Sequence, residues 1–367
     1  MATIERFIAS KGYDRVSCWV NPVALPVGKE VLLLSQKLLI EATDCFSELS
    51  LFRSPDGGKN WCAPESIHCL AGTAGGDGLR ERYLASAMHR CADGRVLVLV
   101  TSFYYDGMNR IVRSRPQRVK YLYFDPARGS WDPPRELELP APADADVLAV
   151  DAQFVQLDGD LLLPYCVRQS SRFYSRIAKI REESDGRLTV ADLSEPVVRE
   201  EGRGFLEPSL CRFEGKYYLS LRSDDSAYCT FSDDWKVFPE ASKWCFADGS
   251  WLGSYNTMTR LLCIGGKLYL VYTRKGLNNG HVFRHRAPLL IGEVVPDKPA
   301  VLPETEQIVV PEHGARLGNF TAAGEDENHA YVSVAEWMQT VPPDTHDCRR
   351  CERYGADNRV WYVKVNS

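Results

Sequence analysis

Short apolar runs, each following a turn, recur six times along the 367-residue chain, and this repetition limits the fold more than any other feature. Each run has the composition of a β-strand, and the turn before it contains glycine or, in the last copy, asparagine. The intervals of roughly 50 to 65 residues are too loose for a short-period solenoid but suit the four-stranded blades of a β-propeller. The six runs occupy residues 27–35, 93–100, 158–165, 214–221, 265–272 and 327–334.

A second plausible strand precedes each of these runs. A glycine-containing turn between two such strands is a hairpin signal. No segment shows the long apolar repeat at every third and fourth position that predicts a helix. The sequence therefore predicts an all-β fold, a six-bladed β-propeller of four-stranded antiparallel blades. The preceding strands are expected within residues 17–25, 83–90, 148–157, 205–213, 255–264 and 316–323.

One closed propeller would use nearly all of the chain. Hydrophobic residues make up 44% of the sequence, which is enough to bury a large core. We therefore expect one domain over residues 1–367, with two domains as the weaker alternative. Either segment 3–9 or segment 359–365 could complete the sixth blade. We expect both to pair there, because joining the two ends in one blade removes an exposed sheet edge.

The bulk composition bears on partners and location. The net charge is only −5, so neither a nucleic-acid partner nor a membrane partner is expected. No apolar stretch reaches 18 residues, and the first 15 residues lack the apolar core of a secretory signal. A cytoplasmic location is expected for the chain as given, or a secreted or periplasmic one if a leader was removed.

The chain contains twelve cysteines, most of them inside apolar strand runs. There they behave as small hydrophobic residues, and reduced thiols are expected. The exception is a polar loop that holds His346, Cys348 and Cys351. A structural zinc site needs four ligands, and no second pair completes the set, so a free thiol pair or a loop disulfide is expected ahead of zinc. No metal and no other cofactor are expected.

Residues 54–61, Ser-Pro-Asp-Gly-Gly-Lys-Asn-Trp, resemble the Asp box S-x-D-x-G-x-x-W. Such a motif locks a hairpin: serine and aspartate oxygens bind turn amides, glycines allow a positive φ, and the tryptophan packs beneath. Degenerate copies are expected at residues 125–131 and 232–235. Asp boxes occur in propellers with many functions, so this resemblance bears on fold and not on chemistry.

Further positions resemble bacterial exo-sialidases, six-bladed propellers with an arginine triad, a tyrosine–glutamate nucleophile pair and an acid/base aspartate. Residues 205–222 are similar to their blade-four pattern, in which a glutamate begins the inner strand and an arginine ends the next. The resemblance implies that Glu207 polarises the nucleophile and that Arg222 is the second triad arginine. Residues 285–291 resemble the strand that supplies the third, which would be Arg286.

The same resemblance implies the rest of the set. Residues 330–336 are similar to the final strand, whose glutamate, here Glu336, holds the first arginine. Arg15 is the candidate for that arginine, although the proline of the usual R-I-P motif is absent. Asp44, ten residues before Ser54, is the counterpart of the acid/base aspartate.

The chain departs from the sialidase pattern at the nucleophile. Where sialidases carry Y-S-x-L, residues 316–320 read Arg-Leu-Gly-Asn-Phe and contain no tyrosine. Tyr255 lies in a similar motif one blade early, and Tyr354 lies in the last blade's loop. Three outcomes remain open: Tyr255 or Tyr354 substitutes, Glu207 activates water directly, or the same platform performs a different reaction.

Loops that enter the inner strands of a propeller share one face with loops that join the second and third strands, so their side chains converge. Arginines outnumber carboxylates among them, and guanidinium groups suit bidentate binding of an anion. We expect an acidic glycan or oligosaccharide as ligand; alternatively, each arginine ties blades together through a carboxylate. The candidate substrate-binding residues are Arg15, Arg222, Arg286, Arg274, Arg316, Asn319, Glu336 and His285, and the candidate catalytic residues are Glu207, Asp44, Tyr255 and Tyr354.

Three functions compete. The leading one is a sialidase-like glycoside hydrolase that acts on a terminal acidic sugar, sialic acid or a related one. The second is a polysaccharide lyase or unusual glycosidase on uronate-containing glycans, in which His281, His285 or a tyrosine shuttles the proton. The third is a non-catalytic propeller that binds carbohydrate.

Overall fold

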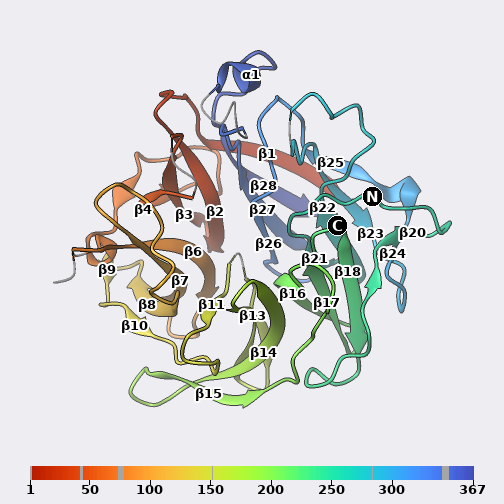
Figure 1. Cartoon of the computed structure of the whole chain (residues 1–367), viewed down its shortest axis with the longest axis horizontal. Helices are drawn as coiled ribbons and strands as arrows, with labels where there is room; N and C mark the ends of the chain where they lie inside the picture. Colours follow the sequence, from red (N-terminus) through yellow and green to blue (C-terminus); the bar gives the residue numbers. More distant parts are fainter. Residues whose placement is uncertain (1, 42–43, 73–77, 151, 283, 341–346) are drawn as a thin grey trace.

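Six antiparallel sheets surround a central axis in the computed structural model, which describes residues 2–41, 44–72, 78–150, 152–282, 284–340 and 347–367 (Figure 1). Four strands form the main path of each sheet, and two sheets carry one extra short strand. The predicted all-β, six-bladed propeller is confirmed.

The first three blades follow one another along the chain, each with its inner strand first. Blade one contains β2 (Ser17–Val27), β3 (Glu30–Leu39), β4 (Phe46–Ser54) and β5 (Glu65–Ser66). Blade two contains β6 (Arg80–Arg90), β7 (Val96–Tyr105), β8 (Val119–Asp125), β9 (Ser130–Trp131) and β10 (Arg135–Glu136). Blade three contains β11 (Asp146–Leu148), β12 (Val155–Leu157), β13 (Asp160–Gln169), β14 (Arg172–Glu182) and β15 (Leu188–Leu193).

The remaining blades complete the ring. Blade four contains β16 (Leu206–Phe213), β17 (Lys216–Arg222), β18 (Ala227–Ser232) and β19 (Ser242–Lys243). Blade five contains β21 (Arg260–Ile264), β22 (Lys267–Tyr272), β23 (Leu289–Glu293) and β25 (Gln307–Val310), beside a small parallel pair of β20 (Cys245–Phe246) and β24 (Ala300–Val301). Blade six contains β26 (Phe320–Gly324), β27 (His329–Ala335), β28 (Val360–Asn366) and β1 (Thr3–Ser10).

All six apolar runs form the second strand of a blade, as predicted, namely β3, β7, β13, β17, β22 and β27. Three of the preceding strands are shorter than predicted. In blade six, β26 begins only at Phe320 within the predicted segment 316–323. The segment 148–157 is divided between β11 and β12, and between them Gln153 donates its side-chain amide to the carbonyls of Leu210 and Leu261 in blades four and five. The segment 255–264 becomes a strand only from Arg260, because Thr257 before it bonds to the blade-six loop and not to a ladder partner.

The two ends of the chain meet in blade six. Strand β1 pairs antiparallel with β28 from Thr3 opposite Asn366 to Ser10 opposite Val360. In Figure 1, β1 and β28 lie side by side although they come from opposite ends of the chain. The expectation that both terminal segments pair in this blade is confirmed, and the outer edge of β28 is covered as a result.

Side chains lock the turn at residues 54–61. Ser54 Oγ accepts a hydrogen bond from the amide of Gly58 at 2.8 Å, and Asp56 Oδ1 accepts one from the amide of Asn60 at 2.8 Å. The indole Nε1 of Trp61 donates to the Gly58 carbonyl at 2.8 Å. These contacts stabilise the hairpin between β4 and β5, while the assignment of the turn to the Asp-box family stays a prediction.

All twelve cysteines lie in the described part of the chain and are free thiols. Cys348 and Cys351 flank or lie in the short helix α1 (Arg349–Glu352) and are both buried. The Tyr13 hydroxyl donates to Cys348 Sγ at 2.6 Å, and Cys351 Sγ donates to the Met338 carbonyl at 3.4 Å. This pair therefore packs the loop against the blades, and His346 lies outside the described residues.

Among the described residues, no helix is long and apolar enough to cross a membrane.

Removing residues 2–10 should destabilise the whole ring, because it strips β1 from the edge of β28. Each ladder hydrogen bond contributes about 1 kcal/mol, so the melting temperature should fall by roughly 10 °C or more. Thermal unfolding followed by circular dichroism measures the change. The matched control is Val16→Ala, at a residue that is 65% exposed directly before β2, and it should melt like the parent. An unchanged melting temperature in the deletion would show that β1 does not hold the ring closed.

Candidate functional site

The candidate site lies on the entry face, which we define as the end of the propeller where the inner strands begin. Glu207 stands at the start of the inner strand of blade four, where the register between β16 and β17 shifts between Leu206 and Ser209. Its φ is +47°, a conformation that costs energy for a residue with a side chain. A bulge of this kind redirects the side chain, so Glu207 leaves the regular alternation of the strand.

Glu207 is held by arginines on two neighbouring elements. Its Oε1 accepts a hydrogen bond from Arg222 Nη1 at 2.6 Å, and its backbone carbonyl accepts one from Arg260 Nη1 at 3.2 Å. Its second carboxylate oxygen, Oε2, is buried and has no hydrogen-bond partner in the part of the chain that the structure describes. Burial alone would raise the pKa of Glu207, but the charges of Arg222, Arg260 and Arg286 outweigh it and lower the pKa. The carboxylate is therefore ionised and has one free acceptor oxygen.

Asn256 joins two of the predicted arginines. Arg222 Nε donates to its side-chain oxygen at 2.8 Å, and Arg286 Nη2 donates to its backbone carbonyl at 2.5 Å. Gly318 makes room for this arrangement, because a Cβ atom there would lie 2.2 Å from Arg286 Cδ. Arg286 itself has a φ of +50°. The loops that lead into β21, β23 and β26 thus fix the position of the Arg286 guanidinium group.

Arg286 and Arg316 carry buried positive charge. Burial, reinforced by the charges of Arg222 and Arg316, lowers the pKa of Arg286 to about 9. Burial likewise lowers the pKa of Arg316 to about 10, and its guanidinium lies 5.3 Å from the ring centre of Trp337. Within the described ranges neither arginine forms an ion pair, and the Nε of each has no hydrogen bond. The described residues therefore do not fully balance the positive charge of these two arginines.

Asp44 faces the same arginines from the loop between β3 and β4. Burial raises its pKa, and the charges of Arg113, Arg316 and Arg222 offset this only in part. Its φ is +50°, and its backbone carbonyl accepts a hydrogen bond from the Tyr105 hydroxyl at 2.5 Å. Asp44 and Glu207 thus have pKa shifts of opposite sign around one group of arginines.

Tyr255 and Asn319 lie in loops that lead into β21 and β26. Tyr255 is half-buried; burial raises the pKa of its hydroxyl, against the charge of nearby Arg286. Asn319 donates its side-chain amide to Asn21 Oδ1 at 2.9 Å. Asn21 has a φ of +48° at a register shift in β2, so blade one repeats at its inner strand the bulge that carries Glu207 in blade four.

The structure places other predicted site residues in separate pairs. Arg15 has a side chain that is 74% exposed and pairs with Glu352 at 3.0 Å. Arg274 forms a two-pronged ion pair with Glu306, with both distances 2.8 Å. Among the described residues neither arginine forms a hydrogen bond or ion pair with Glu207 or Arg222, and the satisfied pair of Arg274 matches the alternative in which an arginine ties loops together.

Glu336 is 1% exposed and pairs with Arg359 at 2.9 Å, not with Arg15 or Arg316. Tyr354 is 43% exposed and its ring centre lies 4.2 Å from that of His281. His285 is completely buried beside Glu312 at 3.1 Å. These contacts form two small clusters, one at the end of β27 and one between the loops of blades five and six.

Sequence reasoning missed several residues that complete the site. Asn256 follows Tyr255 in a motif whose sequence signal is the tyrosine, although an asparagine between two arginine-bearing loops is a suitable connector. No sequence motif marks three further arginines, because each one acts on a carboxylate that is distant in the sequence. These are Arg113, Arg260 and Arg359. Their roles depend on how neighbouring blades meet.

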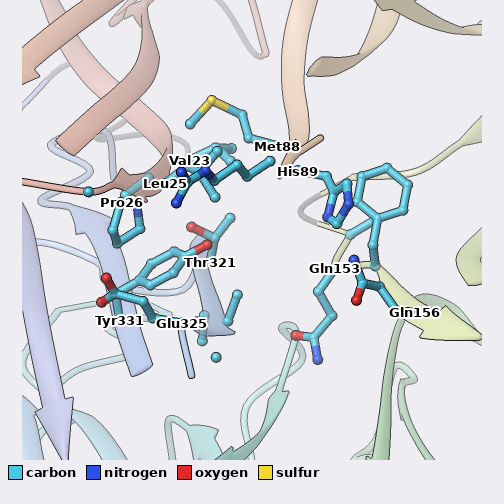
Figure 2. Close-up of a pocket in the computed structure, with 18 residues that line it drawn as sticks. Val23, Leu25, Pro26, Met88, His89, Gln153, Gln156, Thr321, Glu325 and Tyr331 are labelled. Atoms are coloured by element: carbon cyan, nitrogen blue, oxygen red, sulfur yellow. The ribbon is translucent and has the colours of Figure 1, made fainter. Parts of the chain in front are cut away.

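A cavity of 420 Å³ opens at the other end of the inner strands (Figure 2). It is lined by the ends of β2, β6 and β26 together with residues 152–154 and 156, and Figure 2 shows His89 and Gln153 across from Tyr331 and Glu325. Glu325 is the single carboxylate among its described lining residues. Cleavage of a glycosidic bond needs an acid together with a base or nucleophile, so the entry face is the better candidate.

No protein-family model matches the chain, and no curated protein matches it. Among solved structures, a Dyadobacter fermentans protein of unknown function is 17% identical over 99% of both chains, with a TM-score of 0.68. The Trypanosoma rangeli sialidase, solved with sialic acid, is 14% identical over 98% of this chain and 58% of its own, with a TM-score of 0.57. The NanB sialidase of Streptococcus pneumoniae is 10% identical over 98% of this chain and 70% of its own, with a TM-score of 0.61. The chain therefore has a sialidase-like propeller fold, and at these identities the likeness concerns the fold alone.

The contacts of the Glu336 carboxylate should make the free energy of unfolding depend on pH. Burial alone would raise the pKa of Glu336, but His313, whose Nδ1 lies 3.2 Å from Oε1, and hydrogen bonds from the amides of Asp357 and Arg359 outweigh it, so the pKa is lowered. A lowered pKa means that the stabilisation is present above the ordinary value of 4.5 and is lost as the pH falls through the folded-state value. We expect Glu336→Gln to lower the free energy of unfolding by about 3 kcal/mol at neutral pH, with the difference shrinking below pH ~4.

Urea denaturation across pH measures this difference. Glu352→Gln is the control, because it removes a carboxylate from an exposed pair and should cost less than about 1 kcal/mol. A Glu336→Gln deficit that stays constant down to pH ~3 would contradict the ionic origin of the stabilisation.

Proposed function

We propose that this propeller is a glycoside hydrolase that acts on a terminal acidic sugar, sialic acid or a related one, at its entry face. The observation that carries the proposal is the unbalanced buried charge of Arg286 and Arg316, which form no ion pair among the described residues. A sugar carboxylate would supply the missing negative charge, and planar guanidinium groups bind a carboxylate through paired hydrogen bonds. Arg222, already held by Glu207 and Asn256, would complete the binding group.

The two carboxylates at this face suit opposite roles. Burial keeps the pKa of Asp44 raised, so the protonated form persists to higher pH and can protonate the leaving-group oxygen. The arginines lower the pKa of Glu207, which stays ionised, and its free Oε2 is the acceptor for the proton of the nucleophile. A pair of carboxyl groups with opposite pKa shifts is what hydrolysis of a glycosidic bond requires.

Tyr255 is our candidate for the nucleophile. It adjoins Asn256, which binds Arg222 and Arg286, and the charge of Arg286 acts on its hydroxyl. A tyrosine approaches an anionic substrate without the repulsion that a carboxylate nucleophile would meet. If Glu207 activates water directly instead, Tyr255→Phe would retain most of the activity.

The first test is turnover of aryl glycosides of sialic acids and uronic acids, with a neutral aryl arabinoside beside them. We expect release from an acidic glycoside and a loss of about 100-fold or more in kcat/KM for Arg222→Ala/Arg286→Ala, because each charge-assisted contact contributes about 1.5–3 kcal/mol. Gly318→Ala should weaken turnover too, since its methyl group would displace the Arg286 side chain. Arg15→Ala, an exposed arginine in a separate pair, is the control and should behave like the parent.

The other readings give distinct results in the same assay. Release from the neutral glycoside alone would refute an acidic sugar as the substrate but would still identify the chain as a glycoside hydrolase. An unsaturated product absorbing in the near ultraviolet would identify a lyase. Binding of an acidic sugar without turnover of any substrate would identify a carbohydrate-binding propeller.

Asp44 should govern the alkaline limb of the pH profile. As the pH rises through its raised pKa, the carboxyl loses the proton that the leaving group needs, so kcat/KM for a glycoside with a poor leaving group should fall. Asp44→Asn should cost about 10²–10⁴-fold on that substrate and remove the alkaline limb. A nitrophenyl glycoside, whose leaving group needs little protonation, is the internal control. Equal losses on both substrates would assign Asp44 a structural role.

A further inference from the structure

A second group of polar side chains on the entry face plays no part in the proposed hydrolysis. His281 and His285 lie in the loop between β22 and β23, and Glu312 lies in the loop between β25 and β26. The Nε2 atoms of both histidines approach the same carboxylate oxygen, Glu312 Oε1, at 2.9 Å and 3.1 Å. The three ligand atoms all lie within 4.8 Å of one another.

The proton positions on His285 are informative. Its Nδ1 lies 3.1 Å from the backbone carbonyl of Asn279, and because a carbonyl can only accept, Nδ1 must carry the proton. In the neutral ring, Nε2 then presents a lone pair toward Glu312 Oε1, which also presents lone pairs. No described residue forms a hydrogen bond with Nε2, and the ring is completely buried. Two lone pairs that face each other repel, and a cation between the two atoms would replace this repulsion with attraction.

The loop supports His285 in this orientation. The side-chain amide of Asn279 donates to the carbonyls of Arg274 at 2.9 Å and Ala287 at 2.7 Å, so the same residue braces both sides of the loop. A histidine that donates Nδ1–H to a backbone carbonyl and leaves Nε2 free has the outer-shell pattern of a metal ligand.

We propose that His281, His285 and Glu312 bind a divalent transition-metal ion, with Zn²⁺ as the best fit. Two imidazole nitrogens and one carboxylate are a common zinc set, and such a set leaves a fourth position for water or another ligand. The ring of Tyr354, 4.2 Å from that of His281 between centres, covers one side of the cluster. This site departs from the sequence expectation, which considered zinc only at Cys348 and Cys351 and favoured no metal.

The bound ion would join two loops that enter the candidate site. His285 immediately precedes Arg286, and Glu312 lies in the same loop as Arg316. An ion held by His285 and Glu312 would therefore fix the segments that carry both unbalanced arginines. It would serve the positioning of these arginines and take no part in bond cleavage.

The test is metal binding by the full chain, produced without a histidine tag and stripped with a chelator. Zn²⁺ is titrated by calorimetry, and Co²⁺ is added to a second sample for its visible spectrum, which reports the coordination geometry. We expect one ion per chain, a rise in melting temperature with Zn²⁺, and a four-coordinate Co²⁺ spectrum.

Two variants and two controls decide the assignment. His281→Ala and Glu312→Gln, both at half-buried side chains, should weaken Zn²⁺ binding at least about 100-fold while near-ultraviolet circular dichroism stays unchanged. His329→Ala, at an exposed histidine beside Asp326, and Cys348→Ser/Cys351→Ser should bind like the parent. No stoichiometric binding, binding that survives in the first two variants, or binding lost in the cysteine variant would each overturn the proposal. Because the readout is binding, the result does not depend on whether the chain hydrolyses a sugar.

Discussion

Closure of blade six is the constraint on which the rest of the structure depends. The inner strands of a propeller contact one another only around the axis, so their positions are fixed only when the ring is complete. Here the ladder between β1 and β28 completes it with segments from opposite ends of the chain. The side chain of Arg6 adds a link to the neighbouring blade by donating to the carbonyls of Val309 and Ile308. Only in the closed ring do loops from blades one, four, five and six meet at one face.

Within that ring, proline marks the places where a site residue leaves the strand pattern. Asn21 and Glu207 each precede a proline, each has a positive φ, and each sits at a register shift in an inner strand. Proline cannot donate to the ladder, so a bulge there sacrifices little pairing while it redirects the preceding side chain. The residue before proline ordinarily avoids this conformation, and the strain at Glu207 is held by Arg222 and Arg260.

These dependencies explain what could be predicted from the sequence. Hairpins depend on a local turn and on apolar alternation, so all six second strands were correct. Glu207 and Arg222 could be paired because Leu206 lies opposite Arg222 within a single hairpin. The ends of the inner strands in blades three and five were wrong because contacts between blades, made by Gln153 and Thr257, replace ladder pairing. The partner of Glu336, Arg359, could not be found because the choice between it and Arg15 depends on how the loop beyond β27 folds back.

The candidate anion site and the proposed metal site are linked through electrostatics. After burial, the charges of Arg222 and Arg316 are the main cause of the lowered pKa of Arg286, so Arg286 lies in a positive field. A divalent ion brings two positive charges and Glu312 contributes one negative charge, so the loaded cluster would carry one net positive charge at this face. Such an ion would strengthen the binding of a carboxylate by the arginines. Coupling between binding sites is reciprocal, so a bound acidic sugar would equally strengthen retention of the ion. A propeller with both sites would therefore hold its arginine-bearing loops most firmly when both ligands are present.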